Sequence, residues 1–144
     1  MKWPSELRIQ VHSKESGQPM RGAVLFILIP ACRKNGYSLG PFVTDERGEV
    51  RITREGAERA ISAIRAESPM DYADDLEECL PILRVDVESR KSLQERWSRI
   101  KDFYPEDAGR LRSLLNGGAR LASTASRVEI DMSKQEDLID IEVT

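Results

Sequence analysis

Hydrophobic and polar positions alternate strictly from Leu7 to His12, with Leu7, Ile9 and Val11 on one side of the chain. A period of two is typical of a strand with one buried face. Residues 22–29 are instead continuously apolar and rich in branched side chains. This pattern predicts a strand that is covered on both faces, so we expect a helical segment to pack on its second face.

Two further strand-like runs, residues 42–44 and 49–53, flank the polar segment Asp45–Gly48. An Asp at the start of such a segment and a Gly at its end are typical of a tight antiparallel connection, with the Gly in the left-handed conformation. The first third of the chain is therefore predicted to form four strands in meander-like order.

Helical spacing replaces the period of two over residues 54–81. Thr53 precedes this region as a candidate N-cap. Ser68 followed by Pro69 predicts the start of a second helix, which Pro81 ends. The apolar stripe of the first helix consists of Ala57, Ala60, Ile61 and Ile64.

Residues 82–88 return to alternation, with Leu83, Val85 and Val87 predicted to point inward. Residues 89–118 are predicted to form a second helical pair, and residues 126–144 two C-terminal strands joined by a short polar loop. The first helix of this pair has an apolar stripe of Leu93, Trp97, Ile100 and Tyr104, and the second one of Ala108, Leu111 and Leu115. Trp97 and Tyr104 are therefore expected in the core.

The order of elements predicts an α+β fold, a mainly antiparallel β-sandwich with helical insertions. We expect a single domain, 1–144, with a four-stranded β region (1–53), a helical pair (54–81), a strand (82–88), a helical pair (89–118) and C-terminal strands (126–144). The predicted sheet core contains Leu7, Ile9, Val11, Leu25, Ile27, Val50, Ile52, Val85, Val87, Ile130 and Ile141.

The segments Ser16–Leu25 and Val43–Ile52 carry a motif that resembles the start of a prealbumin-like β-sandwich. They are similar to carboxypeptidase regulatory-like and transthyretin-like domains, which follow the pattern G-x-P-x-x-G-A-x-V … T-D-x-x-G-x-x-x-I. The match spans about residues 7–53. The resemblance implies a prealbumin-like fold and a structural or interaction module. The related 5-hydroxyisourate hydrolases use several histidines, whereas this chain has His12 alone, so their catalytic set does not carry over.

The composition of the chain limits the kinds of functional site that it can form. The 144 residues have a net charge of −3, which indicates no global field for nucleic acid or an anionic membrane. His12 is interpreted as an exposed strand histidine, and Cys32 and Cys79 as free thiols. We expect no catalytic residues, no metal site and no cofactor. The chain shows no secretory signal and no apolar run near the ~20 residues of a membrane helix, which predicts a cytoplasmic protein without membrane contact.

One cluster of acids leaves a catalytic alternative open. Asp71, Asp74, Asp75, Glu77 and Glu78 crowd the second predicted helix. A solvated acidic face is the favoured interpretation, because runs of charge are most often exposed surface. The alternative is a carboxylate- or metal-dependent hydrolase with Mg²⁺ on this helix.

Charge is segregated along the chain. Residues 70–88 hold seven acids and one base, residues 90–120 eight bases and four acids, and residues 129–144 six acids and one base. The arginines of the basic segment either pair with the acidic segments of the chain or bind an acidic partner protein. The candidate partner-binding residues are Arg90, Arg96, Arg99 and Arg110.

These features favour a non-catalytic protein-binding module, such as a small adaptor, an immunity protein or a subunit of a bacterial assembly. The sequence is also compatible with a homo-oligomer. A nucleic-acid-binding accessory protein is a further alternative, but a net excess of four bases is small for a surface that tracks phosphates.

Overall fold

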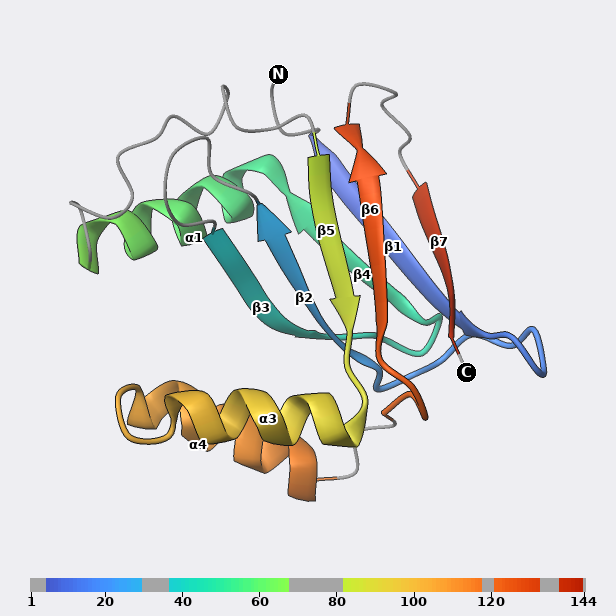
Figure 1. Ribbon diagram of the computed structural model, residues 1–144. Coiled ribbons are helices and arrows are strands. Elements are labelled where there is room, and N and C mark those ends of the chain that lie inside the picture. The colour runs from blue at the N-terminus through green and yellow to red at the C-terminus, as the bar shows by residue number, and fades with distance from the viewer. Residues whose placement is uncertain (1–4, 30–36, 68–81, 118–120, 133–137, 144) are drawn as a thin grey trace.

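The computed structural model describes residues 5–29, 37–67, 82–117, 121–132 and 138–143 (Figure 1). These residues form seven strands and three helices. The strands are β1 (Glu6–Ser13), β2 (Val24–Ile29), β3 (Tyr37–Val43), β4 (Glu49–Thr53), β5 (Ile82–Val87), β6 (Ser126–Asp131) and β7 (Leu138–Val143). The helices are α1 (Arg54–Glu67), α3 (Arg90–Ile100) and α4 (Pro105–Asn116).

The strands form two sheets that face each other. One has the order β4-β1-β7 and the other β3-β2-β5-β6. All pairings are antiparallel except that of β1 with β7. The predicted α+β fold, a mainly antiparallel β-sandwich with helical insertions, is confirmed.

The predicted meander of the first four strands is wrong. β1 pairs with β4, whereas β2 pairs with β3 in the other sheet. The segment Asp45–Gly48 therefore carries the chain from one sheet to the other. Gly48 has a φ of +73°, and a Cβ there would lie 2.6 Å from the carbonyl oxygen of Val11. Only glycine fits this approach, because β1 and the crossing turn meet backbone to backbone. The C-terminal strands β6 and β7 likewise belong to different sheets.

The Asp45 carboxylate holds this turn together. It accepts hydrogen bonds from the backbone N–H groups of Arg47, at 2.8 Å, and Glu49, at 3.0 Å. The hydrogen bonds from Glu49 and Arg47 lower the pKa of Asp45 from its ordinary value of 3.8. Both bonds favour the ionised form over the protonated one.

We expect the contribution of Asp45 to stability to be present above pH 3.8 and to be lost as the pH falls through the lowered folded-state pKa. Asp45→Asn removes the charge but keeps an acceptor oxygen. The variant should therefore be less stable than the wild type near pH 6, and the gap should shrink near pH 3. Urea unfolding at both pH values tests this, and a gap that does not depend on pH would contradict it.

The main core lies between the two sheets. Ten of the eleven predicted core residues are buried, and Ile130 is partly buried against them. The inward positions of β5 are Leu83, Val85 and Val87, as predicted. Ala57 and Ile61 of α1 join this core, and α1 contacts β3 and β4 at one side of the sandwich. Thr53 caps α1 as predicted, accepting a hydrogen bond from the N–H of Gly56 at 3.1 Å.

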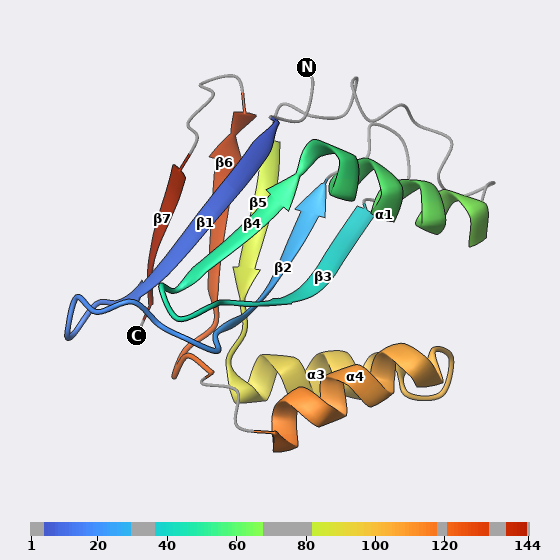
Figure 2. The ribbon, with the colours of Figure 1, turned by 180° about the vertical axis from the view of Figure 1, so that it is seen from behind.

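The second face of β2 is covered, as its continuous apolar sequence predicts. Val24 and Phe26 point away from the main core and pack against α3 and α4, which lie outside the sheet (Figure 2). This outer cluster, as we call it, consists of Val24, Phe26, Leu93, Leu111 and Leu115.

Trp97 is partly buried against the outer cluster, but the prediction that Tyr104 lies in the core is wrong. Tyr104 is 57% exposed, because α3 ends at Ile100 and the apolar stripe does not continue through the turn. The predicted helix over 68–81, with its acidic cluster and Cys79, lies outside the described residues, as does Cys32.

Candidate functional site on the α3–α4 hairpin

The start of α3 is fixed by two serines. Ser89 is the N-cap, and its hydroxyl accepts a hydrogen bond from the N–H of Ser92 at 3.1 Å. The Ser92 hydroxyl accepts in turn from the N–H of Ser89 at 2.9 Å. This reciprocal cap satisfies two helix N–H groups and sets the direction in which α3 leaves β5.

Arg96, one turn further along α3, reaches back to the sheet. Its guanidinium donates to a carboxylate oxygen of Glu88 and, at 3.1 Å, to Asp86. The Glu88 carboxylate also accepts from the hydroxyl of Ser92. The side chains of Glu88 and Asp86 are 3% and 10% exposed, so both carboxylates are largely removed from solvent. The guanidinium carbon of Arg96 lies 4.0 Å from the centre of the Phe26 ring, a cation–π contact.

Asp86 is shared among three arginines. Arg96 is the first of them. The other two are Arg84 and Arg127, whose Nε atoms lie 3.1 Å and 3.4 Å from Oδ1 of Asp86. Arg84, Arg127 and Asp86 lie on the outer face of the sheet, because residues of β5 and β6 alternate between its two faces, and Arg96 reaches this face from α3. The charges of β5 are thus neutralised within the chain.

Sequence reasoning missed the burial of Asp86 and Glu88. Their alternation with Val85 and Val87 predicts a solvated face, and both belong to the acidic segment 70–88. The signal that could have found them is the apolar run of β2, the neighbour of β5. A helix that covers β2 on its outer face also covers the outward residues of β5.

The four predicted site residues all lie on the α3–α4 hairpin, but their side chains do not converge on a single site. Arg96 is tied to Asp86 and Glu88. Arg90 donates to the carbonyl oxygen of Leu115 at 3.2 Å and thereby links the two helices. Arg110 pairs with Asp107 in the first turns of α4. Arg99 is exposed and forms no ion pair with any residue that the structure describes.

Aromatic side chains occupy the far end of the hairpin. Phe103 and Tyr104, in the turn between α3 and α4, are 76% and 57% exposed. Trp97 carries two cations above its ring, with Lys101 Nζ 5.0 Å and the guanidinium carbon of Arg112 6.0 Å from the ring centre. The turn aromatics are large apolar surfaces that the fold itself leaves uncovered.

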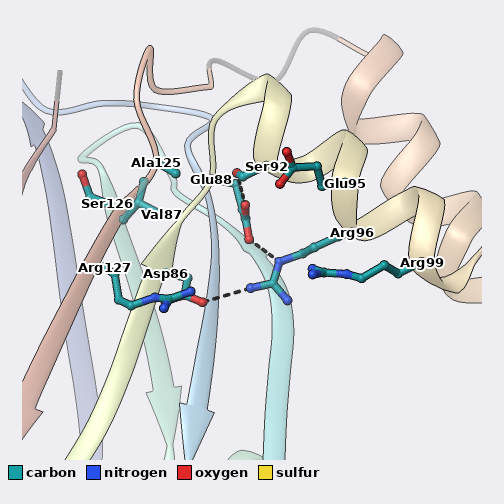
Figure 3. A pocket seen from close by; sticks show the side chains of 10 residues that line it. All are labelled: Asp86, Val87, Glu88, Ser92, Glu95, Arg96, Arg99, Ala125, Ser126 and Arg127. Carbon is teal, nitrogen blue, oxygen red and sulfur yellow. Dashed lines mark hydrogen bonds and ion pairs between the residues drawn. The ribbon is translucent and has the colours of Figure 1, made fainter.

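A polar pocket of about 410 Å³ lies between α3 and the β5–β6 side of the sheet (Figure 3). Arg96, Arg99 and Arg127 supply its cations and Asp86, Glu88 and Glu95 its anions. In Figure 3 the side chain of Arg99 points toward that of Arg96. A second cavity of about 420 Å³ lies along the outer side of α3, beside Lys91 and Arg99.

His12 is less exposed than its strand position indicated. Its side chain is 22% exposed, and Nε2 lies 3.3 Å from a carboxylate oxygen of Glu142 on the parallel neighbour β7. The described residues contain no group of three or more metal-ligating side chains. Among the described helices, none combines the length and apolarity that a membrane span requires.

No protein-family model matches the chain, and no curated protein matches it significantly. Two solved structures that are similar to it are a transthyretin from Sparus aurata and sea bream transthyretin in complex with thyroxine. Both are 12% identical with a TM-score of 0.44, over 96% of this chain and 87% or 86% of theirs.

Proposed function

We propose that this chain is a non-catalytic protein-binding module that recognises an acidic partner protein with the α3–α4 hairpin. The observation that carries the proposal is the exposure of Phe103 and Tyr104 at the turn. Exposed aromatic side chains on a rigid element are the residues that most often dominate binding energy at protein interfaces. The outer cluster fixes the hairpin on the sheet, so its turn is presented in a defined position.

Charge supports an acidic partner. Over residues 90–116 six bases are exposed, against four exposed acids. This excess is small, so we assign most of the affinity to the aromatic residues and assign to the cations the steering of the encounter. The same small excess disfavours the nucleic-acid alternative.

The double variant Phe103→Ser/Tyr104→Ser tests the proposal. We expect its melting temperature to match that of the wild type, because exposed substitutions usually change stability by within about 0.5 kcal/mol. Proteins captured from the native cell by the wild-type chain, quantified by mass spectrometry, should fall at least ten-fold with the variant. Val43→Ser is the matched control, since Val43 is 46% exposed but lies on β3.

Equal capture by the wild type and the double variant would refute the role of the turn. If nuclease treatment abolishes capture, the nucleic-acid alternative replaces the proposal.

A further inference from the structure

We infer that the pocket between α3 and the β5–β6 side of the sheet binds one carboxylate group. The inference deepens the proposed function and rests on it for the source of that group, an acidic residue of the partner. It does not depend on the turn aromatics, which lie at the far end of α3.

The pocket is built from elements that the fold holds firmly. Its wall on one side is α3, which the reciprocal cap of Ser89 and Ser92 anchors. The opposite wall is β5 with the start of β6, whose pairing runs from Ile82 with Asp131 to Val87 with Ser126. In Figure 3 the side chains of Arg96 and Arg127 reach Asp86 from these two walls.

Arg96 is a fixed donor at the back of this pocket. Phe26 covers one face of its guanidinium, while Glu88 and Asp86 accept from Nε and one terminal nitrogen. A guanidinium carries five N–H donors, so Arg96 retains donors beyond those two contacts. Its orientation is set before any ligand arrives, which lowers the entropic cost of binding.

Arg99 lies three residues after Arg96 and faces the same pocket without an ion pair among the described residues. Like charges three residues apart on a helix repel each other. A bound anion relieves that repulsion and accepts from both planar forks, the geometry in which arginine recognises a carboxylate. Arg127, with a side chain 65% exposed, offers further donors from the sheet.

The balance of charge favours a monoanion over a dianion. The side chains that line the pocket are balanced, with three guanidiniums, those of Arg96, Arg99 and Arg127, against the three carboxylates of Asp86, Glu88 and Glu95. One carboxylate ligand adds a single negative charge to this set. A phosphate dianion would add two negative charges beside three carboxylates, so we expect it to bind less tightly.

The experiment is a titration of the full chain, followed by the NMR signals of the arginine Nε–H groups at constant ionic strength. N-acetyl-glutamic acid amide supplies a side-chain carboxylate, N-acetyl-alanine a terminal one, and inorganic phosphate at pH 8 a dianion. We expect saturable shifts at Arg99 and Arg127 with a dissociation constant in the millimolar range, as the usual binding free energy per ligand atom allows. The carboxylate probe that binds more tightly shows whether the natural ligand group is a side-chain carboxylate or a C-terminal carboxylate of the partner.

Arg99→Gln should weaken the carboxylate titration at least ten-fold. Arg59→Gln, an exposed position on α1 outside the pocket, should leave it unchanged. Shifts that never saturate, equal shifts with chloride, or tighter binding of phosphate would overturn the inference, and the wild-type titration alone is enough to show each of these. Such a result would leave the proposed function intact as long as the Phe103/Tyr104 double variant still loses its partner.

Discussion

Replacing Arg96 with methionine is expected to lower the free energy of unfolding by about 3 kcal/mol, because the change leaves a buried charge without its partner. Glu88, 3% exposed at its side chain, would keep only the hydroxyl of Ser92 among the contacts described above. Asp86 would keep Arg84 and Arg127. Methionine retains the apolar contact with Phe26 but not the cation–π attraction. Urea unfolding with an unchanged m-value is the appropriate measurement.

Two controls separate a buried ion pair from a general loss of charge. Arg110→Met removes an arginine whose partner Asp107 is itself 52% exposed, and it should cost less than about 1 kcal/mol. The double variant Arg96→Met/Glu88→Leu should recover much of the lost stability, since replacing both partners of a buried pair with apolar residues is often neutral. A small cost for Arg96→Met would mean that water reaches the Glu88 carboxylate.

Because Arg96 stabilises the fold, a substitution there cannot test partner binding by itself. A charge reversal at Arg96 would place a third carboxylate beside Asp86 and Glu88 and is expected to detach α3 from the outer face of the sheet. A substitution of Arg99 should not destabilise the fold in this way, because Arg99 is exposed and no described residue pairs with it. Binding experiments therefore belong at Arg99, and stability experiments at Arg96.

The strands could be predicted from the sequence because alternation is a local property. The run from Leu7 to His12 and the run from Ile82 to Val87 both show their buried face within six residues. Which strands pair could not be predicted in this way. The short connection Asp45–Gly48 is as compatible with a hairpin as with a turn between sheets, and the parallel pairing of β1 with β7 joins the two ends of the chain.

The candidate site could be predicted only in part. Sequence located the basic helices and the apolar run of β2 that needs a cover. The burial of Asp86 depends on that cover, which comes from residues ten or more positions away. The exposure of Tyr104 depends on where α3 ends. Its spacing from Ile100 continues the helical stripe, but the chain turns first and the ring remains in solvent.

Leu93→Ala is expected to destabilise the α3–α4 hairpin by about 3 kcal/mol, within the usual range for a buried leucine. Leu93 is fully buried in the outer cluster, which also contains Phe26 of β2 and Leu111 of α4. Its loss leaves a cavity where the hairpin meets the sheet. Leu114→Ala, at a partly buried position on α4, is the matched control and should cost less.

Among the residues that the structure describes, the outer cluster shares none with the core between the sheets, so the damage from Leu93→Ala should be local. Hydrogen exchange measures this directly. In the variant, the amides of α3 and α4 should exchange faster than in the wild type, while those of β1 and β4 keep their order of protection. Equal acceleration in the strands would show that hairpin and sandwich unfold as one unit. The hairpin would then be an integral part of the fold, and the turn that carries Phe103 and Tyr104 would be as rigid as the sheet beneath it.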